Sequence, residues 1–342
     1  MKALIILIRI LKQIDGFMEL YINPHLLNKM MMKTIQILII LLYISNNSIA
    51  QNRSPSISEQ LLNSTIRIEC NRDTIIDGTK RNIVSTGTGF FFSFYINGKD
   101  NTYIVTNAHV INNSKVGILR FTELLDSLPN YGHIVNVQIS NFESLFIKHP
   151  TQDLAIIPLD LIVNNGLVLG KPVYFRSGSE KVLFTTQYDQ KVDYIENAMM
   201  IGYPKGLYDS YNNLPIVRRG LTATPVQIDF QNQPKFLLDI PVYPGSSGSP
   251  VFIYDFSGSY PSKENGRLMS GSRLLLLGIA TQSFNYPFSG EIINDSTGHK
   301  EIMTKLPINV AVVIKATELL AFIPIIKSKV KKDIRRPIRF AN

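Results

Sequence analysis

From Gln51 onward, short apolar runs alternate with clusters of Asn, Gly, Asp, Pro and Ser, and apolar patterns of helical length are nearly absent. Short runs bounded by turn residues are typical of strands, and many of them at close spacing predict an all-β sandwich or barrel. The expected strands cover residues 64–70, 87–96, 101–111, 116–121, 133–140, 153–159, 198–204, 235–242, 250–254 and 273–281.

Two features interrupt this run of strands. Residues 310–323 (VAVVIKATELLAFI) repeat apolar side chains at intervals of three and four and end before Pro324, which predicts one C-terminal helix. A break at residues 164–171 (NNGLVLGK) divides the strands into two comparable sets. The pattern therefore predicts a β body in two halves with a helix packed on it.

Residues 1–50 differ in character from the rest of the chain. A basic start at Lys33, an apolar centre at residues 34–44 and small residues before Gln51 are typical of a secretory signal peptide, cleaved after Ala50. The apolar centre is short for a membrane span, which takes about 20 residues, although an uncleaved signal anchor is the alternative. We therefore expect an exported protein, periplasmic or secreted, with no stable membrane span after cleavage and with translation starting at a methionine within residues 30–32.

The net charge of +9 is concentrated at the two ends of the chain. Residues 1–50 carry more basic than acidic side chains, and the basic tail, residues 324–342, carries Asp333 as its single acid, so the body between them is neutral. The tail shows no pattern of interleaved aromatic side chains, so we expect no nucleic-acid partner. A surface or lipid-associated binding role for the tail is an alternative.

The sequence also argues against a metal or cofactor. Cys70 is the single cysteine, which excludes an internal disulfide and a multi-cysteine metal site, and its apolar strand predicts a small buried side chain. Gly87-Thr88-Gly89 lacks the third glycine of a dinucleotide fingerprint, and residues 98–100 lack both ends of a phosphate loop. No metal-ligand spacing occurs, so we expect no metal and no cofactor.

Residues 241–255 (PVYPGSSGSPVFIYD) place two adjacent serines in a loop of glycines and prolines. Such a loop is either a plain turn between strands or a nucleophile loop, in which glycines let backbone N–H groups converge on an oxyanion. The second interpretation requires a histidine as general base and an acid that orients the histidine.

One histidine and one acid fit those two roles best. His109 ends a strand and can face a cleft, whereas His149 and His299 lie in polar turns and His133 follows a turn at the start of a strand. Asp153 stands at the polar edge of an apolar run, where a carboxylate without a partner is unfavourable.

The motifs TNAHV, QDLAII and GSSGSPV, in this order, resemble the chymotrypsin/trypsin-like serine peptidase family, in its bacterial type without an appended PDZ module. GTGFFF, IGYP and GIAT extend the resemblance over residues 60–323. It implies an all-β fold of two six-stranded antiparallel β-barrels with a C-terminal helix. Barrel 1 would cover about 60–165 and barrel 2 about 171–308, within a peptidase domain of residues 51–323.

The same resemblance implies a role for each site residue. Ser247, the serine of Gly-x-Ser-Gly, would be the nucleophile, His109 its general base, and Asp153 the acid that orients the imidazole. The backbone N–H groups of Gly245 and Ser247 would form the oxyanion hole.

The substrate pocket departs from the best-known members of the family. Ser246 replaces the aspartate that pairs with a newly freed N-terminal amine, so we expect no zymogen switch of that type. Pro241, six residues before the nucleophile, supplies no acid for a Lys or Arg preference, and Ala280 replaces the histidine of the glutamyl-endopeptidase branch. Ala280, Thr281 and Gln282 are expected in the pocket wall, which suggests a small or apolar P1 residue.

These observations give two functional hypotheses. The first is an exported serine endopeptidase that hydrolyses a protein or peptide substrate through an acyl-enzyme intermediate. The alternative is a catalytically inactive pseudo-peptidase that keeps the fold as a protein-binding module. The sequence leaves the oligomeric state open.

Overall fold

The computed structural model describes residues 32–37, 54–76, 79–163, 170–205, 207–256, 258–261, 263, 267–294 and 298–334. The chain divides into two compact units, Met1–Pro55 and Ser56–Asn342. In the first unit the described residues are 32–37, which are helical, and 54–55; the rest of the expected signal peptide lies outside the described residues. Within the described part of the chain, no helix is long and apolar enough to cross a bilayer.

The first half of the second unit is a nine-stranded sheet with the order β5-β4-β1-β2-β3-β7-β6, in which β8 pairs with β4 and β9 pairs with β2. Alternate positions of its strands point into one core, which holds Ile66, Ile68 and Cys70 of β1 together with Leu119 and Phe121 of β4. The strands are β1 (Thr65–Ile76), β2 (Thr79–Ile96), β3 (Lys99–Thr106), β4 (Val116–Leu125), β5 (Leu128–Ser140), β6 (Ile147–Lys148), β7 (Ala155–Pro158), β8 (Val173–Tyr174) and β9 (Gly178–Ser179).

The second half is a closed barrel with the order β10-β11-β12-β17-β16-β13. Its core includes Phe236 and Leu238 of β12, Val251 of β13 and Val313 of β17. The strands are β10 (Asn197–Gly202), β11 (Ile216–Thr222), β12 (Lys235–Asp239), β13 (Pro250–Asp255), β16 (Arg273–Asn294) and β17 (Gly298–Lys315). A separate hairpin pairs β14 (Ser259–Pro261) with β15 (Leu268–Ser270).

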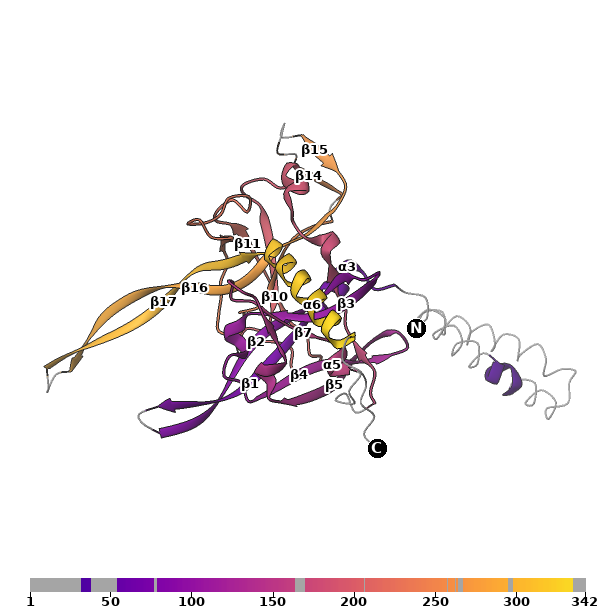
Figure 1. Cartoon of the computed structure of the whole chain (residues 1–342), viewed down its shortest axis with the longest axis horizontal. Coiled ribbons are helices and arrows are strands. Elements are labelled where there is room, and N and C mark those ends of the chain that lie inside the picture. Colours follow the sequence, from indigo (N-terminus) through magenta and orange to yellow (C-terminus); the bar gives the residue numbers. More distant parts are fainter. Residues whose placement is uncertain are drawn as a thin grey trace, which may run out of the picture. The chain divides into compact units, whose positions relative to one another are not determined.

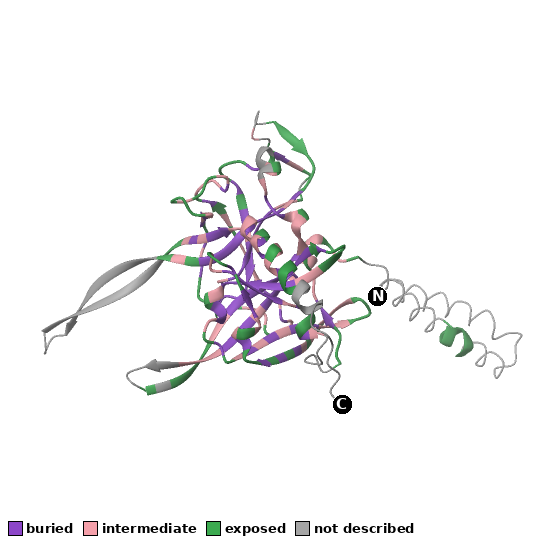
Figure 2. Ribbon diagram, viewed as in Figure 1, coloured by how far each residue is buried: buried purple, intermediate pink, exposed green. Residues whose placement is uncertain are grey.

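A third core joins the sheet to the barrel. Phe92 and Phe94 of β2 pack in one cluster with Phe252 of β13, Ile279 of β16 and Phe322 of the C-terminal helix. Figure 1 shows this helix, α6 (Phe322–Ile334), in yellow, and Figure 2 shows buried residues both within the two halves and between them. This shared core fixes the sheet and the barrel against each other.

Helices precede, connect and follow these strands. α3 (Ile57–Leu62) begins with a capping box, in which the Ser56 hydroxyl accepts from the Glu59 N–H and the Glu59 carboxylate accepts from the Ser56 N–H. The others are α4 (Ala108–Ile111), α5 (Asp160–Val163), α6 (Phe322–Ile334) and the 3-10 helices η1 (Phe142–Leu145), η2 (Glu180–Val182), η3 (Thr186–Lys191) and η4 (Ala316–Ala321).

The double barrel is found only in part. The mostly β fold, one closed six-stranded barrel and a C-terminal helix are as expected. In the first half, however, β5 and β6 at the two ends of the sheet do not pair with each other among the described residues, so closure of a second barrel is not shown. β6 is only two residues long and offers few hydrogen bonds for closure.

Two expected boundaries also differ from the structure. We expected the second barrel to begin near residue 171, but β8 and β9 pair with the first sheet and the barrel begins at Asn197. Residues 164–169 lie outside the described residues. Hydrophobic runs indicate strands but do not indicate their pairing partners.

We also expected a helix over residues 310–323, whereas β17 continues to Lys315, η4 follows, and α6 begins only at Phe322. The reason is that Val310, Val312 and Val313 are β-branched and pair with β12. Pro324 lies in the first turn of α6, where the missing N–H has no helical partner to lose.

Candidate active site

His109 and Asp153 are joined at two points. The Asp153 carboxylate lies 2.6 Å from His109 Nδ1 through Oδ2, and its Oδ1 accepts the His109 backbone N–H at 2.9 Å. His109 is in α4, the short helix that follows β3, and buried Asn107 just before it donates its side-chain N–H to the Asp153 carbonyl at 2.8 Å. Side chain and backbone together therefore fix the ring beside the acid.

The electrostatic environment keeps Asp153 ionised. Burial acts to raise the pKa of this carboxyl, but the hydrogen bonds and charge of His109 and the hydroxyl of Thr281 outweigh burial and hold the pKa below its usual range. The Thr281 hydroxyl donates to Asp153 Oδ2 at 2.8 Å. An ionised carboxylate at Nδ1 holds the ring proton there, so the other ring nitrogen is left to accept a proton.

His149 holds the turn that leads to Asp153. Its Nδ1 accepts the N–H groups of Thr151 at 3.2 Å and Gln152 at 2.8 Å, and its own N–H donates to the Leu154 carbonyl at 2.8 Å. We expected a surface residue, but the side chain is only 2% exposed and its ring packs edge-to-face on Phe322. A side-chain acceptor can cap a turn in this way. The local sequence is the same for a buried capping histidine and for an exposed one, so it does not distinguish them.

The nucleophile loop places Ser247 at the surface and hides its neighbours. Ser246 and Ser249 are 1% and 0% exposed, while Ser247 is half-buried. The Ser247 hydroxyl donates to the Thr281 carbonyl at 3.1 Å, so Thr281 contacts Ser247 through its carbonyl and Asp153 through its hydroxyl. No hydrogen bond among the described residues joins Ser247 directly to His109.

Two glycines give this loop its shape. Gly245 has φ +95° and Gly248 has φ +88°, in the left-handed region that favours glycine. A Cβ at Gly245 would lie 2.5 Å from the Tyr203 carbonyl oxygen, and one at Gly248 would lie 2.0 Å from the Thr88 carbonyl oxygen. Among the described residues, the N–H groups of Gly245 and Ser247 donate to no protein acceptor.

The residues expected around the pocket lie in different settings. Ala280 is fully buried in the barrel core, and its backbone binds the loop through the Gly248 N–H and the Ser249 carbonyl at 2.8 and 2.9 Å. The Pro241 carbonyl accepts from Arg218 at 3.2 Å, and Gln282 is exposed. We had assigned Thr281 to the pocket wall; its contact with Asp153 is an additional feature that sequence reasoning missed.

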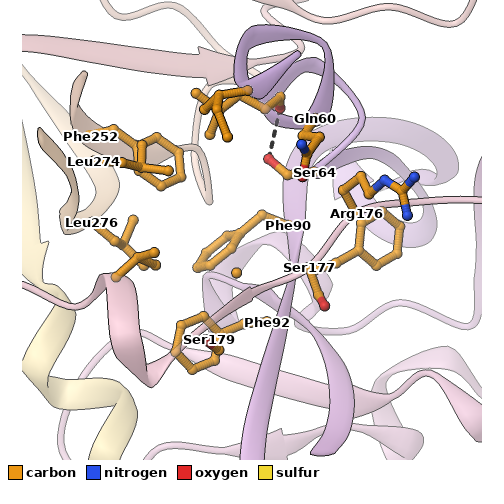
Figure 3. A pocket seen from close by; sticks show the side chains of 15 residues that line it. Gln60, Ser64, Phe90, Phe92, Arg176, Ser177, Ser179, Phe252, Leu274 and Leu276 are labelled. Carbon is orange, nitrogen blue, oxygen red and sulfur yellow. Dashed lines mark hydrogen bonds between the residues drawn. The ribbon is translucent and has the colours of Figure 1, made fainter. Parts of the chain in front are cut away.

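A separate apolar cavity of about 190 Å³ lies between α3, β2 and the barrel. Figure 3 shows Phe90 and Phe92 on one side of it and Phe252, Leu274 and Leu276 on the other. Neither His109 nor Asp153 nor Ser247 lines this space, so it is distinct from the candidate active site.

Cys70 is fully buried, and burial raises the pKa of its thiol. Among the residues described, no group of three His, Cys, Asp or Glu side chains is arranged to bind a metal.

Comparison with known proteins identifies the family. The family model "Trypsin-like peptidase domain" matches residues 87–257, half of the chain. The chain belongs to the trypsin-like peptidase family. The matched segment contains His109, Asp153 and Ser247, and the resemblance derived from the sequence motifs is confirmed.

Further matches to this trypsin-like peptidase domain come from solved structures, of which 78 chains match. No curated protein matches the chain. Among solved structures, the scabies mite inactivated protease paralogue S-I1 shares 13% identity over 80% of this chain and 97% of that chain, with a TM-score of 0.36.

Proposed function

We propose that the protein is an exported serine endopeptidase that hydrolyses peptide bonds with Ser247 as nucleophile, His109 as general base and Asp153 as the orienting acid. The observation that carries this proposal is the two-point attachment of His109 to the Asp153 carboxylate. An ionised acid bound to Nδ1 sets the tautomer that a general base needs at its other nitrogen.

In the proposed reaction the Ser247 hydroxyl turns from the Thr281 carbonyl to Nε2 of His109. The serine oxygen attacks the peptide carbonyl carbon while its proton passes to Nε2. The imidazolium then donates that proton to the leaving amine as the carbon–nitrogen bond breaks, which leaves an acyl ester on Ser247. Water, activated by the same imidazole, hydrolyses the ester and restores the hydroxyl.

The oxyanion of each tetrahedral intermediate would accept the N–H groups of Gly245 and Ser247. Two observations support this assignment. Among the described residues, neither N–H group has a protein acceptor, whereas the carbonyls of Gly245 and Ser247 both accept hydrogen bonds. Losing one such donor typically lowers kcat by about 10²–10³-fold. Pro241, Ala280, Thr281 and Gln282 carry no charge, and we propose a small or apolar P1 residue.

Labelling with a fluorophosphonate probe tests the assignment. The protein from Gln51 onward is compared with Ser247→Ala and Ser246→Ala, because the two serines are adjacent but only Ser247 is accessible. We expect the native protein and Ser246→Ala to label, and Ser247→Ala not to label. Absence of labelling in a folded native protein would reject the enzyme and favour the pseudo-peptidase that binds protein without turnover.

A further inference from the structure

Thr88 of β2 is fully buried and lies beside the nucleophile loop, far from it in the sequence. One edge of β2 pairs with β1 at this position, opposite Arg67. On its other edge β2 pairs with β3, but this pairing begins only at Phe90, so β3 does not pair with Thr88. The Thr88 N–H donates to the Ser247 carbonyl at 2.9 Å, so the loop takes the place of a strand on that edge.

The side chain of Thr88 makes two further bonds to backbone. Its hydroxyl donates to the Gly245 carbonyl at 2.8 Å and accepts the Tyr203 N–H at 2.9 Å. The Thr88 carbonyl in turn accepts the Thr106 hydroxyl at 2.7 Å, which fixes this position within the sheet. The hydroxyl thus ties together the nucleophile loop and the segment after β10.

These bonds hold two of the peptide planes that shape the loop. The Gly245 carbonyl belongs to the plane shared with Ser246, and the Ser247 carbonyl belongs to the plane shared with Gly248. The Ser247 N–H lies in the plane between them, so rotation of either neighbour would turn that N–H away from an oxyanion. We propose that Thr88 is a positioning residue that orients the backbone of the nucleophile loop for acyl transfer; this rests on the proposed function.

The decisive variant is Thr88→Val, which keeps the shape and the backbone N–H but removes the hydroxyl. Because the Gly245 carbonyl then loses its partner, we expect kcat to fall by about 10²-fold with KM within about threefold of the native value, as for misplaced catalytic groups. Thr88→Ser, which keeps the hydroxyl, should restore kcat to within about threefold.

Thr222→Val is the matched control. Thr222 is also buried, and its hydroxyl likewise accepts one backbone N–H, from Glu196 at 2.8 Å, and donates to one carbonyl, that of Tyr194 at 3.1 Å. None of its hydrogen bonds reaches the nucleophile loop. We expect Thr222→Val to lose similar thermal stability and to keep kcat.

The proposal is overturned if folded Thr88→Val retains the native kcat or if Thr88→Ser fails to retain it. It is also overturned if kcat falls as far in Thr222→Val as in Thr88→Val. Should Thr88→Val not fold, Thr88→Ala against Thr222→Ala gives the same comparison. Amide hydrogen exchange of Ser246 adds a readout without turnover: its N–H should exchange at least about tenfold faster in the Thr88 variant alone, because the lost hydroxyl bond holds the Gly245–Ser246 peptide plane. An inactive native protein with this exchange pattern rejects the proposed function and leaves the role of Thr88 in the loop standing.

Discussion

The acid turn and the nucleophile loop are held in different ways. The acid turn, residues 149–153, is capped by its own histidine, whose Nδ1 accepts two N–H groups two and three residues ahead. The nucleophile loop, residues 241–249, is held instead by Thr88, Lys205 and Ala280, which come from three distant parts of the chain. The loop also has local bonds, from the Ser246 N–H to the Tyr243 carbonyl and from the Ser249 N–H to the Ser246 carbonyl. The difference is that the turn before Asp153 is capped by its own histidine, whereas the loop needs several distant residues as well.

This difference has a consequence for folding. A turn closed by neighbouring residues forms with little loss of chain entropy, whereas contacts between distant residues require the sheet and the barrel to be assembled first. The backbone of the loop around Gly245 and Ser247 therefore depends on the junction between the two halves, whereas the turn before Asp153 has a local cap in His149.

The largest expected effect comes from Asp153→Asn. An amide N–H at this position would donate to Nδ1 of His109 and force the ring proton onto Nε2, where it blocks acceptance of the serine proton. We expect kcat to fall by about 10³–10⁴-fold at neutral pH, with KM little changed. Steady-state kinetics on a peptide ester would measure it, and a loss below tenfold would remove the acid turn from the catalytic machinery.

Gly248→Ala tests the tertiary half of the comparison. The added methyl group meets the Thr88 carbonyl at 2.0 Å in a backbone with φ +88°, so we expect a loss of about 3–5 kcal/mol in the free energy of unfolding, from strain and overpacking together. Gly98 is the control, because its φ is +82° but no atom lies within 4 Å of a Cβ there.

In the control Gly98→Ala we expect the free energy of unfolding to fall by only about 1–2 kcal/mol, because only the left-handed backbone conformation is unfavourable for alanine there. Urea denaturation of both variants separates the two contributions. Equal losses would mean that close packing against Thr88 contributes nothing and that the loop is held by its own conformation.

His149→Phe tests the local half. Phenylalanine keeps a ring against Phe322 but offers no acceptor to the N–H groups of Thr151 and Gln152, so the Asp153 carboxylate loses part of its support. Because these N–H groups can turn to water, we expect only about a tenfold fall in kcat, with KM unchanged. His149→Asn, whose side-chain oxygen can accept the same bonds, should restore kcat; failure to do so would make His149 a packing residue only.

The sequence was informative where the chemistry lies in short motifs that follow one another in a fixed order. His109, Asp153 and Ser247 were singled out by motif, and the family that those motifs resemble is confirmed. The loop was expected to use glycines to bring its backbone N–H groups together, and Gly245 has a positive φ. Partners such as Thr88 could not be predicted, because a threonine between two glycines in a strand gives no sign of the loop it meets across the sequence.

The same limit applies to the fold. Apolar runs predicted most strands, but the pairing of β8 and β9 with the first sheet depends on tertiary contacts that a local pattern does not contain. In residues 310–323 two patterns coincide, because a strand of adjacent valines followed by a 3-10 helix repeats apolar side chains at intervals that also suit an α-helix.

The smallest expected effect is a pH dependence of stability that originates in the acid turn. Burial lowers the pKa of His149, the nearby Glu318 carboxylate acts in the opposite direction, and Nδ1 is occupied as an acceptor. The folded state then binds fewer protons at this site than the unfolded state, whose imidazole has a pKa of about 6.5. The stabilising contribution is therefore complete above about pH 6.5 and is lost as the pH falls toward the lower folded value.

Urea denaturation of the native protein and of His149→Asn between pH 7.5 and 5 isolates the contribution of His149 to the free energy of unfolding. Asparagine can still accept the two N–H groups of the turn but does not titrate. We expect the stability difference to shift against the native protein as the pH falls, by at most about 1.4 kcal/mol per pH unit for one proton. Asp153, whose pKa is lowered, loses its contribution only below its ordinary range near 4, outside this window. Parallel profiles would show that His149 does not change its protonation preference on folding, and the acid turn would then be held without the neutral ring.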